Sequence, residues 1–142
     1  MRLQKLGLLL ILMAMWTSSS GQESESGKDD LESGEMMVRI AEIEIEPNYH
    51  NEYLAILKEE AAASVRLEPG VICILPMYQK EHPTEIRLLE IYASKEAYES
   101  HLQTPHFIHY KKTTLHMIKS LKLIDMEVVD VEIMPMIFRK LN

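Results

Sequence analysis

Hydrophobic and polar residues alternate along residues 38–46, which read Val-Arg-Ile-Ala-Glu-Ile-Glu-Ile-Glu. From Ala41 onward every second residue is apolar, so Ala41, Ile43 and Ile45 share one side. The three glutamates of this segment share the other side, as on a solvated strand face. A period of two is typical of a half-buried β-strand. We therefore predict a strand over residues 38–46 that ends before Pro47.

The pattern then changes to helical spacing. Between His50 and Leu67 the buried face is predicted to consist of residues three or four apart, namely Tyr53, Leu54, Leu57, Ala61, Ser64 and Val65. The tripeptide Glu68-Pro69-Gly70 ends this helix, because proline cannot continue a helix and glycine tolerates a positive φ.

Residues 71–78 (VICILPMY) and 85–92 (EIRLLEIY) are rich in β-branched, apolar and aromatic residues. The polar segment 79–84 separates them, so the two runs predict a hairpin. Pro76 indicates that the first of these strands lies at a sheet edge or contains a bulge.

Ser94 is a favourable N-cap for a helix over residues 95–103. Thr104-Pro105 begins another helix, with proline in its first turn, which we expect to continue to Leu121. Residues 126–133 are predicted as the last strand, and residues 136–138 could extend it beyond Pro135.

The element order is β-α-β-β-α-(α)-β, which predicts an α+β, ferredoxin-like fold. Such a fold covers only one face of its sheet with helices. A second copy of the chain is the economical cover for the other face, so we expect a homodimer, with the apolar run Met134–Phe138 as a candidate for reaching across.

The N-terminus has the pattern of a signal peptide. Arg2 and Lys5 precede an apolar run over residues 6–16, and small residues follow up to Gly21. A membrane-spanning helix needs about 20 apolar residues, so this run favours cleavage before Gln22 over retention as an anchor. We predict a signal peptide over residues 1–21 and an exported protein, periplasmic or secreted, with no membrane span after cleavage.

The next segment, residues 22–35, contains six acidic residues and one lysine, and only Leu31 to bury. It predicts a disordered acidic linker, because so few apolar side chains cannot offset the entropy lost on ordering. The folded domain is then predicted over residues 36–142.

The composition of the chain argues against some classes of function. The 142 residues are 46% hydrophobic and carry a formal net charge of −7. A nucleic-acid partner is not expected, because nothing provides the basic surface that phosphates require. The single cysteine, Cys73, excludes an intrachain disulfide and a cysteine-based zinc finger, and we expect it to be buried and inert.

Two motifs resemble a known family. Glu68-Pro69-Gly70 follows the first helix, and residues 90–107 read Glu-Ile-Tyr-Ala-Ser-Lys-Glu-Ala-Tyr-Glu-Ser-His-Leu-Gln-Thr-Pro-His-Phe. Over about residues 36–123 the chain resembles the antibiotic biosynthesis monooxygenase domain family, which includes small quinol monooxygenases. Tyr92 stands where that family often has tryptophan. The haem-degrading branch uses an asparagine on the first strand, which this strand lacks, so haem degradation is not expected.

The resemblance implies a dimeric α+β barrel with an apolar cavity between the helices and the sheet. It also implies oxygen insertion into electron-rich aromatics without a cofactor, because a deprotonated quinol can itself donate an electron to O2. We therefore expect a cofactor-independent monooxygenase that acts on a quinol-like or polyphenolic aromatic. The alternative is a non-catalytic, exported binding module for a small hydrophobic ligand, haem included.

The predicted catalytic residues are His101, His106 and Tyr92. Histidine is the side chain whose ordinary pKa, ~6.5, suits a base near neutral pH. The break at Thr104-Pro105 could turn both imidazoles toward one cavity, with Tyr92 in its wall. The alternative is structural: His101 packs against the sheet and His106 fills the kink.

Tyr53, Tyr110 and Phe107 are the predicted substrate-binding residues, although aromatics at these spacings also suit a core. His106 and His109 could offer a metal pair, but no acidic ligand stands near them in the sequence. We predict that this pair binds no metal and that His109 and His116 are solvated.

Overall fold

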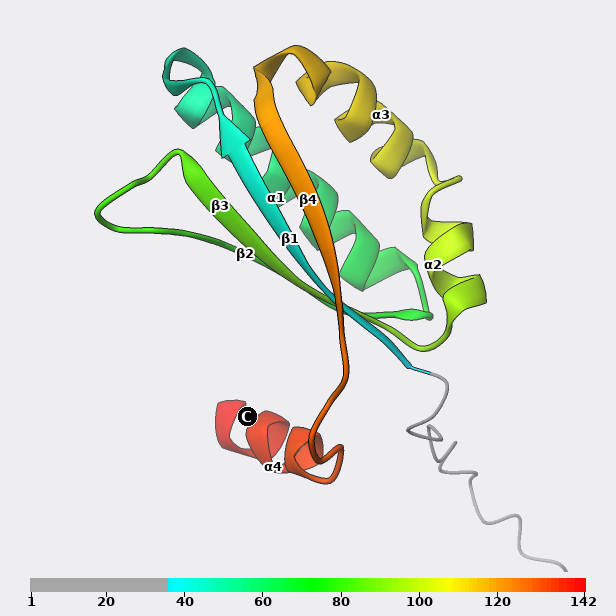
Figure 1. Cartoon of the computed structure of the whole chain (residues 1–142). Helices are drawn as coiled ribbons and strands as arrows, with labels where there is room; N and C mark the ends of the chain where they lie inside the picture. Colours follow the sequence, from blue (N-terminus) through cyan, green and yellow to red (C-terminus); the bar gives the residue numbers. More distant parts are fainter. Residues whose placement is uncertain (1–35) are drawn as a thin grey trace, which may run out of the picture.

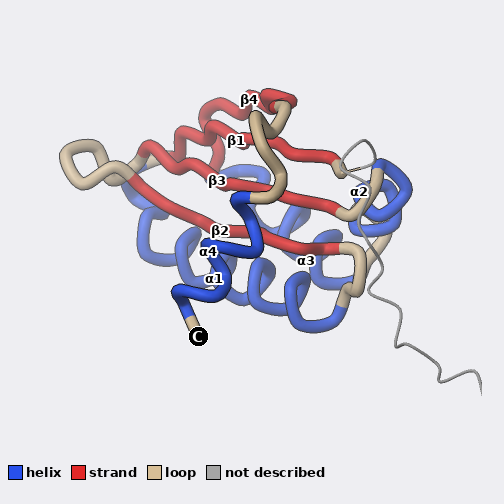
Figure 2. The backbone as a smooth tube through the Cα atoms, turned by 90° about the horizontal axis from the view of Figure 1, so that it is seen from below, coloured by secondary structure: helices blue, strands red, loops and turns tan. Residues whose placement is uncertain are grey.

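The computed structural model describes residues 36–142; the predicted signal peptide and acidic linker lie outside the described residues. One antiparallel sheet is formed by β1 (Met37–Ile45), β2 (Val71–Tyr78), β3 (Glu85–Tyr92) and β4 (Ile118–Met126), in the order β2-β3-β1-β4. Three helices, α1 (His50–Leu67), α2 (Lys95–His101) and α3 (Pro105–Thr114), cover one face of it (Figures 1 and 2). Short 3-10 turns at Pro47–Tyr49 and Leu115–Met117 connect elements. The predicted ferredoxin-like α+β fold is confirmed.

The first half of the chain agrees closely with the predicted pattern. The first helix and both hairpin strands have the predicted bounds, and β2 is an edge strand, as Pro76 indicated. Ala41, Ile43 and Ile45 point toward the helices and are buried. Each large apolar side chain buried in this way contributes about 1.5–3 kcal/mol to folding.

The prediction for residues 105–133 was wrong in part. The helix ends at Thr114 rather than at Leu121, and the last strand is Ile118–Met126 rather than residues 126–133. Leu115, Ile118 and Leu121 stand three residues apart, which continues a helical pattern. The segment is nevertheless the strand that pairs with β1. It lies at the sheet edge and is largely exposed, so the alternation of a half-buried strand is weak there.

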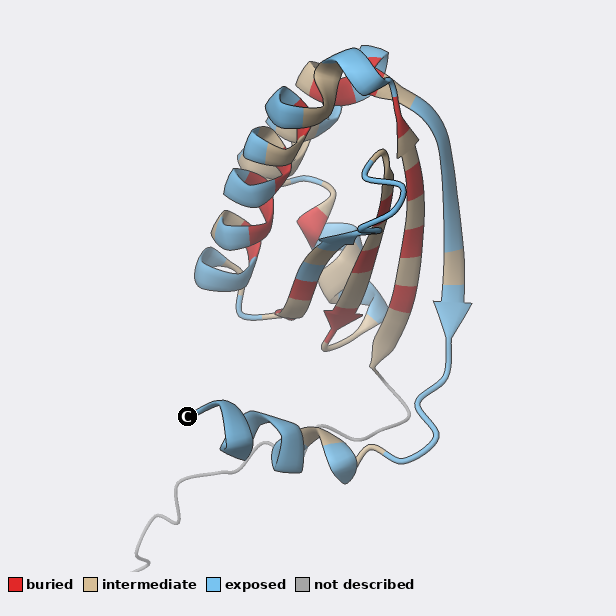
Figure 3. Ribbon diagram, turned by 90° about the vertical axis from the view of Figure 1, so that its left-hand side faces the viewer, coloured by how far each residue is buried: buried red, intermediate tan, exposed pale blue. Residues whose placement is uncertain are grey.

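Residues 136–138 do not extend a strand, because Ile133–Leu141 forms a fourth helix, α4. Pro135 is compatible with this helix since it stands in the first turn, where a backbone N–H has no intrahelical partner. The helix has no buried residue and lies apart from the sheet and the other helices (Figures 1 and 3).

The core lies between the sheet and α1. Tyr53 and Leu57 of α1 pack there with sheet residues such as Ile45 and Ile86, and Figure 3 shows buried positions along the sheet-facing side of α1 and along β1 and β3. Cys73 is half-buried rather than buried, and burial raises the pKa of its thiol. Within residues 36–142, none of the helices has the length and apolarity needed to cross a membrane.

Candidate functional site

A cavity of about 290 Å³ lies between the sheet and the helices α2 and α3. Most of its wall is apolar, with side chains from all four strands of the sheet and from the segment that follows α2: Ala41, Ile43, Ile74, Leu88, Leu102, Phe107, Leu115, Ile118, Leu121 and Leu123. Several buried or half-buried polar groups interrupt this wall, and they include Glu60, Glu90, Tyr92 and His101. A mostly apolar pocket with a few convergent polar groups is typical of a small-molecule site.

Local structure fixes the position of His101. The Ser94 hydroxyl accepts a hydrogen bond from the backbone N–H of Ala97 and so starts α2, whose last residue is His101. The Thr104 hydroxyl donates to the carbonyl of His101 at 2.8 Å and caps α3 at Phe107. The imidazole is therefore held at the junction of two helices, where only 3% of it is exposed.

The turn after α1 brings Glu68 beneath this junction. Gly70 lies so close to α2 that a Cβ at this position would be 2.5 Å from the Cβ of Ala97. The backbone of Gly70 is also held on its other side, because the N–H of Ala93 donates a hydrogen bond to the Gly70 carbonyl at 2.8 Å. Glycine is thus required here for close approach of the turn to α2, rather than for a positive φ.

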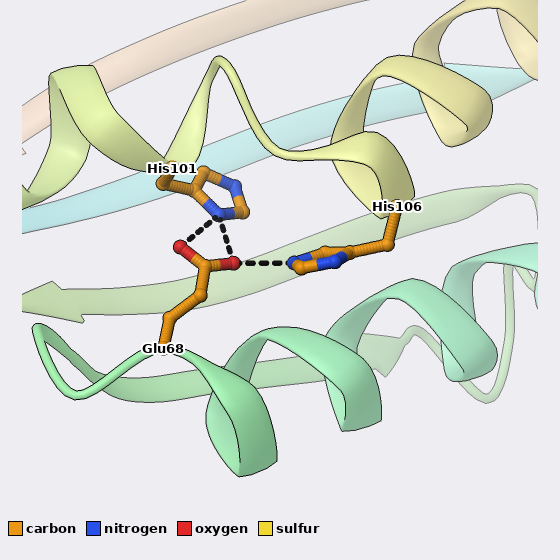
Figure 4. A group of neighbouring side chains, drawn as sticks. All are labelled: Glu68, His101 and His106. Carbon is orange, nitrogen blue, oxygen red and sulfur yellow. Dashed lines mark hydrogen bonds and ion pairs between the residues drawn. The ribbon is translucent and has the colours of Figure 1, made fainter.

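Glu68 joins the two predicted histidines (Figure 4). Its carboxylate accepts a hydrogen bond from His101 Nδ1 at 3.0 Å and one from His106 Nε2 at 2.5 Å. Burial by itself raises the pKa of Glu68, but the two imidazole donors outweigh it and hold the pKa below its ordinary value. The carboxylate therefore stays ionised and orients both rings.

The two histidines do not share a cavity. His101 lines the cavity, whereas His106 is absent from its lining and lies on the other side of Glu68, with 19% of its side chain exposed. Of the other two histidines considered in the sequence, His109 is exposed and His116 is exposed with its ring edge against Tyr49.

Glu60 is a cavity residue that the sequence reading missed. Its side chain is 5% exposed, accepts a hydrogen bond from Ser64 Oγ at 2.8 Å and lies 3.6 Å from His101 Nε2. Burial raises the pKa of Glu60. The signal was present in the helical spacing: Glu60 follows Leu57 by three residues and precedes Ser64 by four, so it belongs to the buried face of α1.

Glu90 is a second, half-buried carboxyl of the cavity. Burial raises its pKa to about 7, although the nearby positive charge of Arg39 acts in the opposite direction. The Arg39 guanidinium is itself bonded to Asp125 at 2.7 Å and lies over the Tyr98 ring, 4.7 Å from its centre. Arg39 also lines the cavity, so its positive charge favours the ionised form of Glu90, but burial has the larger effect on the pKa.

The predicted aromatic residues lie at the cavity or directly behind it. Tyr92 lines the cavity with its ring centre 5.5 Å from that of His101, and Phe107 lies at 4.8 Å from the same ring. Tyr110 also lines the cavity, and burial raises its pKa to about 12. Tyr53 is fully buried behind the lining and shares a 2.6 Å hydrogen bond with the Tyr110 hydroxyl.

Comparison with known proteins gives three results. The family model described as antibiotic biosynthesis monooxygenase matches residues 36–113. A crystal structure from Bacteroides thetaiotaomicron, named as a candidate antibiotic biosynthesis monooxygenase, is 46% identical and superposes with a TM-score of 0.68. The match covers 69% of this chain and 93% of that one. No protein with a curated description matches significantly.

More distant structures have the same fold. A candidate monooxygenase from Lactobacillus acidophilus is 27% identical with a TM-score of 0.63, over 64% of this chain and 43% of its own. A candidate antibiotic biosynthesis monooxygenase from Nitrosomonas europaea is 18% identical with a TM-score of 0.64, over 68% and 93% of the two chains. At 18% identity, this likeness concerns the fold alone.

Proposed function

The chain belongs to the antibiotic biosynthesis monooxygenase family, and on that premise we propose that it inserts one oxygen atom of O2 into a quinol-like or polyphenolic aromatic. The substrate would bind in the cavity next to α2 and α3. The observation that carries this proposal is the pairing of His101 with Glu60 in a mostly apolar wall.

The reaction needs a proton acceptor because an ionised phenol gives up an electron to O2 far more readily than a neutral one. A general base must come within hydrogen-bond reach of the phenolic proton. In the hydrogen-bonded arrangement, His101 donates its Nδ1 proton to Glu68, which leaves the Nε2 lone pair on the side of Glu60 and the cavity. His101 and Glu60 together therefore take up the proton from the substrate.

The electrons and atoms balance without an external reductant. A hydroquinone and O2 give a hydroxyquinone and water. One oxygen atom enters a ring C–H bond and the other is reduced to water, with all four electrons supplied by the substrate. The proton taken up by His101 and Glu60 returns to the departing oxygen. The apolar walls exclude bulk water during these steps.

The cavity limits the size of the substrate. Small-molecule sites usually have volumes of about 300–1,000 Å³, so a cavity of about 290 Å³ suits one or two rings. The aromatic side chains of Tyr92, Phe107 and Tyr110 offer stacking or edge contacts to such rings.

Oxygen consumption with a panel of hydroquinones and polyphenols, in metal-free buffer, tests the proposal. Saturable turnover above autoxidation is expected for at least one member. Saturable ligand binding without such turnover would contradict the oxygenase and favour the alternative, an exported binding module for a small hydrophobic ligand.

We also propose that the protein is a homodimer. The strand alternation places Val38, Ile40 and Leu75 on the sheet face that the helices leave open. The α4 helix exposes a second apolar surface, which includes Ile137 and Phe138. A second copy would cover both surfaces, which supports a symmetric assembly.

Export is a further part of the proposed function. It rests on the basic start, apolar run and small residues of residues 1–21 in the sequence. The oxidation would then take place in the periplasm or outside the cell.

A further inference from the structure

Two imidazoles and one carboxylate converge behind the cavity wall, at the junction of α2, α3 and the turn after α1 (Figure 4). One ligand atom from each of Glu68, His101 and His106 lies within 4.8 Å of the other two. Two histidines and one carboxylate are a donor set that binds Zn²⁺ and related divalent ions. We propose that these three residues bind one Zn²⁺ ion.

The three ligand atoms must move by small amounts to bind an ion. Bonds of about 2.0–2.2 Å to a tetrahedral zinc ion place neighbouring ligand atoms roughly 3.3 Å apart. The Glu68 oxygen is 3.0 Å from His101 and 2.5 Å from His106, so both of these distances must lengthen. The two histidine nitrogens lie within 4.8 Å of each other, so any excess over the tetrahedral spacing must be closed. These movements fall on the two least enclosed side chains, since Glu68 is 12% and His106 is 19% exposed. The ion would replace the two protons that Glu68 now accepts.

The surroundings of His101 provide an independent argument. A histidine that binds a metal through one ring nitrogen usually donates its other N–H to a carboxylate, which fixes the ring. Here His101 Nδ1 faces Glu68, and Nε2 lies 3.6 Å from the buried carboxylate of Glu60. Ser64 in turn holds Glu60 by a 2.8 Å hydrogen bond. The Glu60 carboxylate thus lies just beyond hydrogen-bond distance of Nε2, and a small approach would let it support a zinc-bound His101.

The two carboxyl groups near His101 also favour the binding of a divalent cation. Glu60 and Glu68 bring two carboxyl groups into a largely buried region, where uncompensated charge is costly. A divalent cation neutralises both carboxylates when the two histidines are neutral ligands.

The proposed ion would lie outside the cavity. The His101 ring lies between the proposed ion and the cavity, because Nδ1 faces Glu68 while Nε2 lies near Glu60, a cavity-lining residue. The ion would not touch a substrate, and it acts by holding His101.

Isothermal titration of the purified, EDTA-treated chain with ZnCl2 tests the site. We expect one equivalent with a Kd in the micromolar range or tighter. Glu60→Gln should weaken binding roughly 10–100-fold, and Glu68→Gln and His106→Ala should weaken it further. His109→Ala is the matched control, because His109 is an exposed histidine on the same helix as His106.

Visible spectra of the Co²⁺-loaded chain add a second readout, in which His106→Ala should abolish the tetrahedral absorption bands. Failure to bind one equivalent overturns the inference, as does binding that Glu68→Gln and His106→Ala leave unchanged. If Glu68→Gln fails to fold by circular dichroism, the partly exposed His106 still decides the question. The zinc titration needs no substrate, so it tests the metal site without the oxygenase activity. Oxygen uptake by the EDTA-treated chain tests the oxygenase activity without the metal. A negative result in one experiment therefore leaves the other proposal unaffected.

Discussion

Replacing Glu90 by glutamine should stabilise the protein at pH 8 and change its stability little at pH 5. Glu90 lies on β3 and lines the cavity, where burial raises its pKa to about 7. Near neutral pH and above, the wild-type protein must therefore keep an ionised carboxylate in a poorly solvated place. Glutamine has nearly the same shape and no charge.

The magnitude follows from the difference in pKa between the folded and unfolded states. An unfolded glutamate has a pKa of 4.5, against about 7 in the folded protein. Between these values the folded state binds more protons than the unfolded state, so stability falls as pH rises through this window. At 1.36 kcal/mol for each pKa unit, the full cost above pH 7 is about 3 kcal/mol.

Urea unfolding followed by circular dichroism at pH 5 and pH 8 measures the effect. The free energy of unfolding of Glu90→Gln minus that of wild type should rise by about 2.5 kcal/mol between the two pH values, because a small part of the full cost is already present at pH 5. Glu60 is present in both proteins, and its charge contributes to the raised pKa of Glu90, so the difference includes the interaction between the two carboxyl groups. Glu85→Gln removes a charge from the same strand on its other face and serves as the control. An equal difference at both pH values would refute the reasoning.

Three further outcomes are expected. Gly70→Ala should lower the free energy of unfolding by about 1–3 kcal/mol, because the added Cβ would lie 2.5 Å from the Cβ of Ala97. Thermal unfolding should show a decrease of roughly 4–20 °C in Tm. An unchanged Tm would contradict the close approach of the turn to α2. His101→Ala should lower kcat by roughly 10²–10⁴-fold in the oxygen-uptake assay, whereas His109→Ala should leave kcat unchanged. Equal losses of kcat in the two variants would show that His101 has only a structural role. Light scattering should give twice the chain mass for the intact protein and less after truncation at residue 130; an intact monomer would contradict the dimer.

Much of the fold could be predicted because its signals are local. The alternation at Ala41, Ile43 and Ile45 and the proline and glycine after Leu67 each depend on a few neighbouring residues. The Ser94 cap is equally local, since it bonds a backbone N–H three residues away. Residues 118–126 lacked such a signal, because an exposed edge strand acquires its conformation from pairing with β1.

The candidate site was predicted only in part. His101, Tyr92, Phe107 and Tyr110 line the cavity, whereas His106 lies behind Glu68 and does not. These residues stood out because their types carry known chemistry or aromatic surface. Their mutual orientation could not be read from the chain, since it depends on how α2 and α3 pack on the sheet.

The sequence by itself determined the order of the elements up to the last strand, the buried face of the first strand and the residue types available for proton transfer. The tertiary structure decided which carboxyl groups matter. Glu60, Glu68 and Glu90 are ordinary glutamates in the chain, and only folding removes them from water and sets two of them on opposite ring nitrogens of His101. The physical reason is that hydrophobic periodicity acts between neighbours along the chain, whereas desolvation and hydrogen bonding act between groups that are near in space and, for Glu68 and His101, 33 residues apart.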